Sequence, residues 1–124
     1  MKIRIKGNSV RFRLTKTEVE NFAIKGVYTS ETELMGGVFK YRLQRSEDYT
    51  HLAAEWNQSE NEIIFFMPKS IADEWTESNE VGFQHIQILP NGTELFLLVE
   101  KDFVCLDNTF EDQSDNYPNP NAVC

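Results

Sequence analysis

Apolar and polar residues alternate over short stretches of the chain, and these stretches are separated by Gly, Asn and Pro residues that favour turns. Such alternation is typical of strands that bury one face against a core. We therefore predict eight strands, at about 2–6, 10–14, 27–34, 38–45, 50–56, 62–67, 83–89 and 93–100.

Two segments have the spacing of a short helix instead. Thr15 and Glu18 match a capping box, which predicts a helix of about two turns that ends at Gly26. A second short helix is expected after Pro68, with Trp75 on its apolar side. The predicted order is ββαββ followed by ββαββ, so the fold class is α+β.

Eight antiparallel strands in a chain of this length imply a strongly curved sheet or a partly closed barrel, with the two helices packed against it. The repeated order hints at an internal duplication, although the two halves have no residue-level similarity that supports one. No linker divides the chain. We expect one domain over residues 1–106 and an acidic tail over residues 107–124 that contains Pro and Asn and is able to dock on the domain.

Composition limits the class of protein. With 124 residues, 40% of them hydrophobic, the chain fits one globular domain, and no apolar run is long enough to span a membrane. Two cysteines are too few for a disulfide scaffold, and residues 1–13 lack the apolar core of a secretory signal, so we expect a cytoplasmic protein with reduced thiols. The net charge of −8 makes nucleic acid an unlikely partner.

The charge is unevenly distributed. Residues 1–16 hold six cations and no acid, and the other 108 residues hold the other six cations and all 20 acids, a net charge of −14. A turn at residues 7–8 sets Arg4 against Arg11 and Lys2 against Arg13, and a turn at residues 8–9 sets Arg4 against Arg13. In either register the cations share one face of the hairpin. We therefore take Lys2, Arg4, Arg11 and Arg13 as candidate anion-binding residues.

Like charges on facing positions destabilise a hairpin, so this face needs negative charge from elsewhere. The next hairpin is expected to neutralise itself, with Glu33 facing Lys40 and Glu31 facing Arg42. Three sources of negative charge stay open for the first hairpin: solvent with its counterions, the acidic tail, or an anionic ligand such as a phosphate compound or an acidic protein segment. In the tail, the candidate counter-charges are Glu111, Asp112 and Asp115.

No arrangement of acid, base and nucleophile emerges from the sequence, so we assign no catalytic residue, no metal site and no cofactor. His51 and His85 each lie in a predicted strand, and His85 is expected close to Glu100. Such a pair is capable of acid–base chemistry, but a hydrogen-bonded, partly buried histidine is the commoner case. Trp56 and Trp75 are expected to anchor the core.

Two resemblances bear on this interpretation. An eight-stranded barrel with cations inside is similar in layout to the CYTH or triphosphate-tunnel family, whose first strand carries Glu-x-Glu-x-Lys. Residues 2–6 read Lys-Ile-Arg-Ile-Lys instead, so the resemblance implies no metal site here. The opening segment 1–14 and the tail 111–120 together resemble a small, uncharacterised bacterial family of Bacteroidetes type, which implies a stand-alone domain and no particular activity.

Two functions from different classes are therefore open. The first is a small, non-catalytic binding or interaction domain, with the basic hairpin face as its working surface. The second is a phosphate-binding or phosphohydrolase-like protein, which would need carboxylates that converge near the cations to hold a divalent metal.

Overall fold

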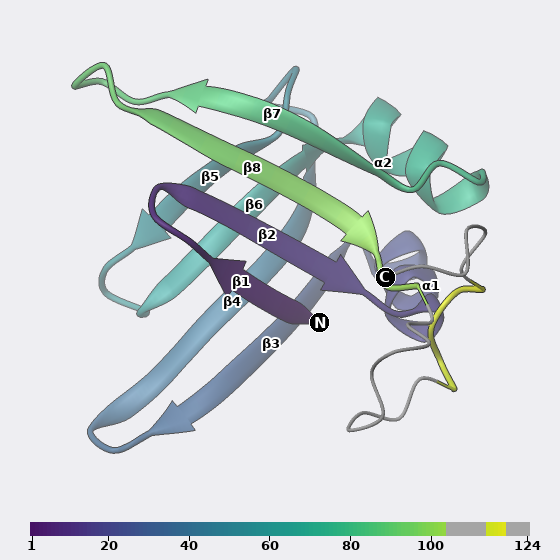
Figure 1. Cartoon of the computed structure of the whole chain (residues 1–124), viewed down its shortest axis with the longest axis horizontal. Coiled ribbons are helices and arrows are strands. Elements are labelled where there is room, and N and C mark those ends of the chain that lie inside the picture. The colour runs from purple at the N-terminus through teal and green to yellow at the C-terminus, as the bar shows by residue number, and fades with distance from the viewer. Residues whose placement is uncertain (104–113, 119–124) are drawn as a thin grey trace.

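The computed structural model describes residues 1–103 and 114–118 (Figure 1). Its eight strands and two helices follow the predicted order. They are β1 (Lys2–Ile5), β2 (Ser9–Leu14), α1 (Lys16–Lys25), β3 (Val27–Leu34), β4 (Gly37–Ser46), β5 (Ala53–Asn57), β6 (Glu62–Pro68), α2 (Lys69–Glu77), β7 (Gly82–Ile88) and β8 (Glu94–Lys101). No helix in the described ranges is long and apolar enough to cross a membrane.

The strands form two separate four-stranded sheets. Sheet A has the order β1-β2-β8-β7, and sheet B has the order β3-β4-β6-β5. Each sheet joins two antiparallel hairpins through a parallel central pair, β2 with β8 and β4 with β6. The expectation of antiparallel strands only is therefore wrong, and two sheets take the place of the expected single curved sheet or partly closed barrel. The α+β class is confirmed.

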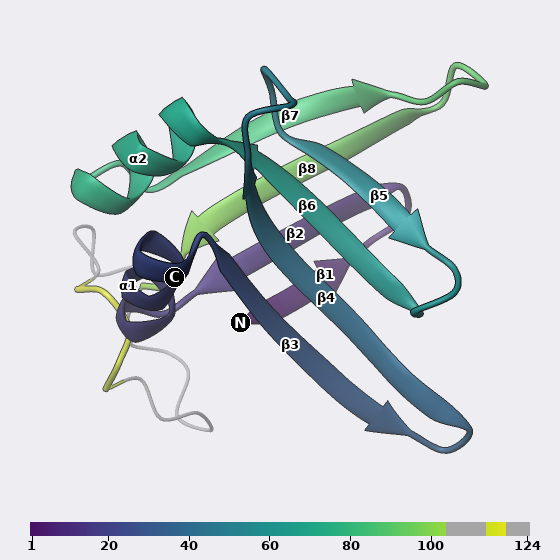
Figure 2. The same cartoon turned by 180° about the vertical axis from the view of Figure 1, so that it is seen from behind.

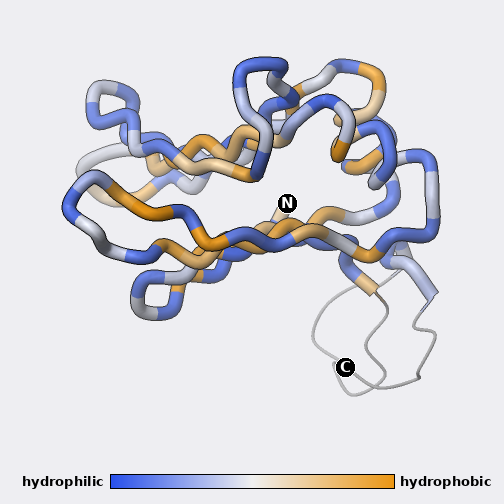
Figure 3. Tube along the Cα trace, turned by 90° about the horizontal axis from the view of Figure 1, so that it is seen from above, coloured by the Kyte–Doolittle hydropathy of each residue, from blue (hydrophilic) through white to orange (hydrophobic). Residues whose placement is uncertain are grey.

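The two sheets pack face to face, with their strands crossing (Figures 1 and 2). Buried apolar side chains from both sheets form one core, and Figure 3 shows the two layers of the chain from the side. Both helices lie at one end of the sandwich, where Phe22 of α1 meets Trp75 of α2 with ring centroids 6.1 Å apart. Both of these rings are fully buried, so the helices close this end of the core.

The helix α1 begins as the sequence predicts. The Thr15 side chain accepts a hydrogen bond from the Glu18 backbone, and the Glu18 side chain accepts one from the Thr15 backbone. Gly26 ends the helix with a φ of 74°, a conformation that favours glycine. The capping box and this glycine fix where the chain turns from sheet A into sheet B.

The chain folds as two halves with the same topology. Residues 2–46 contribute one hairpin to each sheet, and residues 53–101 do the same in the reverse order. The registers agree: Ser9 faces Phe96 at the start of the parallel pair in sheet A, and Glu62 faces Lys40 at the start of the parallel pair in sheet B. A pseudo-twofold relation therefore carries β1–β4 onto β5–β8.

Equivalent positions in the core carry similar residues. Phe12 of β2 and Phe65 of β6 occupy the same place in the two halves, and their rings stack on each other with centroids 4.0 Å apart. Leu14 corresponds to Met67 in the same way, and both are fully buried. The duplication that the element order hints at is thus visible in the pairing of the strands and in the packing of the core.

The hairpin of β3 and β4 has a different register from the expected one. Leu34 pairs with Gly37, so the turn is at residues 35–36, and Gly36 takes a φ of 95°. Glu31 then faces Lys40, whereas Thr29 faces Arg42 and Glu33 faces Val38. The predicted Glu33–Lys40 and Glu31–Arg42 pairs are therefore wrong, because only one of the two neighbouring glycines lies inside the turn.

Candidate functional site

The cations of the first hairpin lie on the outer face of sheet A. Lys2 faces Arg13 and Arg4 faces Arg11, which is the register expected for a turn at residues 7–8. The Lys6 backbone donates to the Ser9 carbonyl at 3.1 Å and closes this turn. On the other face of the hairpin, Phe12 and its neighbours enter the core.

Carboxylates at the end of β8 supply much of the negative charge that this face needs. Glu100 lies beside Arg13 in the parallel register, and its Oε1 is 2.6 Å from Arg13 Nε and 3.2 Å from Arg11 Nη1. Asp102 Oδ2 lies 2.9 Å from Lys2 Nζ. Sequence reasoning missed both acids, because it paired β8 with β7 alone and not with β2.

Of the three candidate tail acids, Asp115 lies within the described residues. Asp115 lies at the start of α1, where its Oδ1 accepts hydrogen bonds from the Thr17 hydroxyl at 2.8 Å and the Thr17 backbone at 3.3 Å. Hydrogen bonding with the Thr15 side chain, and after it with Thr17, holds the pKa of the Asp115 carboxyl below its ordinary value. Glu111, Asp112 and the two cysteines, Cys105 and Cys124, lie outside the described residues.

Residues 114–118 contact the end of β8. The Tyr117 backbone donates to the Asp102 carbonyl at 2.8 Å, and the Tyr117 ring lies over Lys101. The Lys101 side chain faces the interior and donates to the Ser78 carbonyl at 2.8 Å. Burial lowers the pKa of this amine, with the charge of Glu80 opposing the change. Lys101 is therefore part of the interior, although its neighbour Glu100 lies on the outer face.

Two cations of the hairpin have no compensating charge among the residues that the structure describes. Arg4 and Lys6 are exposed, and neither forms an ion pair within the part of the chain that the structure describes. Arg11, which faces Arg4, already shares Glu100 with Arg13. The outer face of the hairpin therefore has an excess of positive charge at the end nearest its turn.

An apolar strip lies on the same outer face, and β2 separates it from β1. It consists of the outward side chains of β7 and β8, which are Ile86, Ile88, Phe96 and Leu98. Leu98 is the neighbour of Arg11 across the parallel pair, and Phe96 is the neighbour of Ile86. Ile86 is 48% exposed and Ile88 is 61% exposed. In Figure 1 this side of sheet A is the near side, and no helix crosses it. We call the four cations Arg4, Lys6, Arg11 and Arg13, together with this strip, the cationic–apolar face.

The pseudo-twofold provides an internal comparison for this face. The positions on sheet B that correspond to Arg4, Arg11 and Arg13 are Glu55, Ile64 and Phe66. The cations of sheet B lie on β4. Lys40 and Arg42 pair with Glu60 and Glu62, each at 3.1 Å, and Arg45 donates to the Ala23 carbonyl at 3.3 Å. Core positions are alike in the two halves because packing constrains them, whereas the outer faces have diverged. The excess of positive charge belongs to sheet A.

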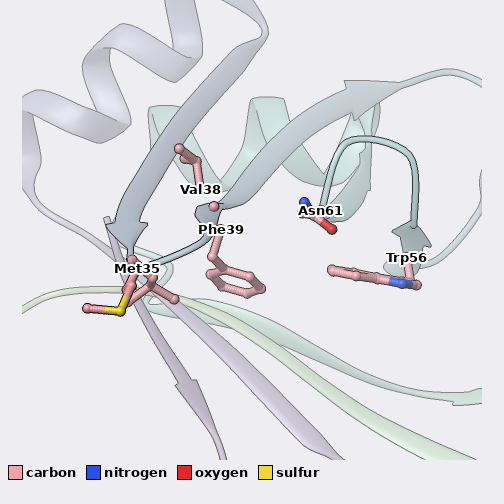
Figure 4. A pocket seen from close by; sticks show the side chains of 7 residues that line it. Met35, Val38, Phe39, Trp56 and Asn61 are labelled. Carbon is pink, nitrogen blue, oxygen red and sulfur yellow. The ribbon is translucent and has the colours of Figure 1, made fainter.

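A shallow groove of about 220 Å³ lies at the opposite end of sheet B from the helices. Its lining includes Leu34, Met35, Phe39, Trp56 and Asn61 (Figure 4). The Phe39 and Trp56 rings are 6.4 Å apart and inclined by 25°.

Trp56 is 55% exposed, so the prediction that it anchors the core is wrong, whereas Trp75 is in the core as expected. Trp56 is the second-last residue of β5, at a position that sheet A does not cover. The alternation of apolar and polar residues does not reveal this.

The two histidines stack on each other where the edges of the two sheets meet. Their rings are 4.5 Å apart and inclined by only 5°. His85 faces Leu97, and Glu100 faces Gly82, so the expected His85–Glu100 pair is wrong by the register of the hairpin. His51 lies just before β5 and not in a strand.

Within residues 1–103 and 114–118, no three His, Cys, Asp or Glu side chains gather into a group that could hold a metal ion.

The amino group of Met1 forms an ion pair with Glu18, which ties the start of β1 to α1. The Tyr28 hydroxyl donates to the same carboxylate at 3.1 Å, and the Tyr41 hydroxyl donates to the Met1 carbonyl at 3.0 Å. Burial alone would raise the pKa of Glu18, but the ammonium and the hydrogen bonds outweigh it, so the pKa lies below its ordinary value. These contacts fix the position of the cationic hairpin on the body.

Comparison with known families gives one match, to a model described as Family of unknown function (DUF7009), over residues 1–121. Searches of curated proteins and of solved structures each found no match.

Proposed function

The chain belongs to this family of unknown function, and within it we propose that the domain is a non-catalytic binding module whose working surface is the cationic–apolar face. The ligand is an acidic segment of another protein. One observation carries the proposal: Arg4 and Lys6 have no carboxylate partner among the described residues, and they share the outer face of sheet A with an exposed apolar strip. Protein interfaces combine apolar contacts with charges that are complementary across the interface.

The rest of the molecule supports this choice. The overall charge of −8 disfavours acidic partners everywhere except on this face, so binding there is selective in position. Residues 1–106 form the binding domain in this proposal, residues 107–124 form its tail, and the protein works in a bacterial cytoplasm. The resemblance of both ends of the chain to a bacterial family and the low cysteine count support the last point.

A titration with a defined peptide tests the proposal. The probe is the peptide Thr-Glu-Val-Glu-Val-Glu-Thr, and its matched control has Lys in place of each Glu. We expect the full-length chain to bind the acidic peptide only, with an affinity that decreases as salt screens the charges. The variant Arg4→Glu should weaken binding at least tenfold, whereas Lys25→Glu, at an exposed position on α1, should change it less than twofold. Equal binding of both peptides, or no effect of Arg4→Glu, would contradict the proposal.

One observation favours a second function. Arg4 and Arg11 face each other across the hairpin, and two arginine forks so placed suit a phosphate group. The phosphate-binding alternative predicts that millimolar tripolyphosphate raises the melting temperature of the protein by mass action, and more so with magnesium. An equal rise for Arg4→Glu would show that the anion binds elsewhere.

A further inference from the structure

We propose that β1 accepts an extended acidic segment as a fifth strand of sheet A. This inference rests on the proposed function and specifies how the partner binds: the segment pairs through its backbone with the free edge of β1. Its acidic side chains lie on the outer face with Arg4 and Lys6, and its apolar side chains lie on the inner face. Addition of a strand to a sheet edge is a general mode of peptide recognition.

The edge of β1 has backbone groups that no other described strand pairs with. Within residues 1–103 and 114–118, β1 is the outermost strand of sheet A and has β2 as its single partner. The hydrogen bond from Lys6 to the Ser9 carbonyl shows that Lys6–Ser9 is a hydrogen-bonded pair of the hairpin. Hydrogen-bonded and non-hydrogen-bonded pairs alternate along an antiparallel ladder, so Arg4–Arg11 and Lys2–Arg13 are also hydrogen-bonded pairs. The N–H and C=O groups of Ile3 and Ile5 therefore point away from β2.

The second half of the fold shows what a closed edge looks like. β5 is the equivalent of β1, and the backbone N–H of Ala54 corresponds to that of Ile3. Ala54 donates to Gln87 Oε1 of β7 at 2.8 Å, so this edge is covered by the other sheet. The equivalent of Gln87 is Thr32, whose shorter side chain is exposed and makes no such hydrogen bond among the described residues. Within the described part of the chain, the edge of β5 is therefore covered at Ala54, and the edge of β1 has no such cover at Ile3.

The side chains around this edge define the partner. On the outer face, the Arg4 and Lys6 cations call for acids at alternate positions of the added strand. On the inner face, Ile5 is 55% exposed, and Leu34 in the groove of sheet B is 60% exposed. Apolar residues between the acids would cover exposed apolar surface at this open end of the sandwich. The sequence pattern recognised is therefore an alternation of acidic and apolar residues in an extended segment.

Cations on an edge strand have another known effect, which is to discourage pairing with other chains. A second copy of this chain is also a conceivable occupant, because β3 is an edge strand that carries Glu31 and Glu33. We commit to the acidic segment of a partner, because the cations that face solvent on β1 are complementary to it. The experiment distinguishes an acidic partner segment, a second copy of the chain, and an edge that pairs with neither.

The test measures amide hydrogen exchange in the full-length chain, with and without the peptide Thr-Glu-Val-Glu-Val-Glu-Thr. We expect the amides of Ile3 and Ile5 to exchange at least tenfold more slowly when the peptide is bound, whereas the Arg4 amide, which already bonds to β2, changes little. Two N-methylated peptides are the matched controls. In an antiparallel added strand the Val and Thr nitrogens face β1, and in a parallel one the Glu nitrogens do, so methylation of one set should abolish binding.

A pair of proline variants tests the same point from the protein. Ile5→Pro removes an N–H that points to the open edge and should abolish peptide binding. Gln84→Pro makes the same change on the other edge of sheet A, at an exposed position of β7 outside the cationic–apolar face, and should leave binding unchanged. The melting temperature of each variant shows that it is folded. If Ile5→Pro fails to fold, the exchange measurement on the unaltered chain decides alone.

The possible failures are distinguishable. If the peptide binds but neither methylated form is weakened and Ile3 and Ile5 stay unprotected, strand addition is wrong and binding on the face stands. If no peptide binds, both proposals fall. If the Ile3 and Ile5 amides become protected with rising protein concentration alone, the occupant is a second copy, and the acidic partner segment is wrong.

Discussion

Glu100 is the residue on which the charge balance of the cationic hairpin depends, and its replacement by Gln tests that balance directly. The change keeps the size and one hydrogen-bonding oxygen but removes the charge shared by Arg11 and Arg13. A hydrogen bond to a charged group contributes about 1.5–3 kcal/mol to the net free energy of unfolding when it is well buried. The pairs here are partly exposed, since the Glu100 side chain is 18% exposed and that of Arg13 is 42% exposed, and this reduces their contribution.

The loss of Glu100 has a second effect. Arg4 faces Arg11 and Lys2 faces Arg13, and each like-charge pair costs about 0.2–1 kcal/mol when nothing offsets it. Together the two effects predict that Glu100→Gln lowers the free energy of unfolding by about 1–2 kcal/mol at low ionic strength, and by clearly less in 1 M salt. Urea denaturation at the two salt concentrations measures both values.

Glu60→Gln is the matched control. Glu60 also pairs with one cation, Lys40, but the Glu60 side chain is 57% exposed, so the change should cost less than about 0.5 kcal/mol. A loss for Glu100→Gln that is no larger than the loss for Glu60→Gln, or that is independent of salt, would refute the idea that β8 neutralises this hairpin. Glu100→Gln should also bind the acidic peptide more tightly, because removal of this carboxylate adds one net positive charge to the cationic–apolar face.

Three further predictions concern the body of the domain. In a double-mutant cycle of Phe12→Leu and Phe65→Leu, urea denaturation should give a coupling of about 0.5–1.5 kcal/mol from the stacked rings, and additive effects would contradict the stack. The lowered pKa of Glu18 means that its stabilisation is present above its ordinary pKa and is lost as the pH falls through the folded-state value. Glu18→Gln should therefore be less stable than the unaltered chain at pH 7, with the difference shrinking towards pH 2 in urea melts, and a constant difference would refute this. Gly82→Ala should prevent normal folding or lower the melting temperature strongly, because the added Cβ would lie 2.2 Å from the Val99 carbonyl oxygen, and an unchanged melting temperature would contradict that close approach.

Local signals along the chain were enough to predict the elements. The capping box at Thr15 and the glycine at residue 26 mark both ends of α1, and the turn at residues 7–8 sets the register of the first hairpin. These features depend on residues close together in the sequence, where propensity and hydrogen bonding act directly. The class and the order of the elements follow from them.

The pairing between hairpins was not predictable in the same way. Arg13 and Glu100 are 87 residues apart, and only the parallel pairing of β2 with β8 brings them together. One signal was present: Glu100 is an acid at an outward position directly after five apolar residues of β8, and such a residue often faces a cation on a neighbouring strand. The exposure of Trp56 depends on where sheet A ends over sheet B, which is a property of the tertiary fold and has no counterpart in the local pattern.

Each half of the chain contributes one hairpin to each sheet, and this has a consequence for how the chain folds during synthesis. β2 is complete at residue 14, yet its second neighbour, β8, ends at residue 101. Sheet A therefore stays an isolated hairpin until nearly the whole domain has left the ribosome, and a two-stranded hairpin alone is marginal in water. Its apolar face, with Phe12, lacks the stacked ring of Phe65 until residue 65 has been added. Folding of this domain is expected to be slow and largely post-translational, because closing so long a loop precedes the contacts that stabilise it.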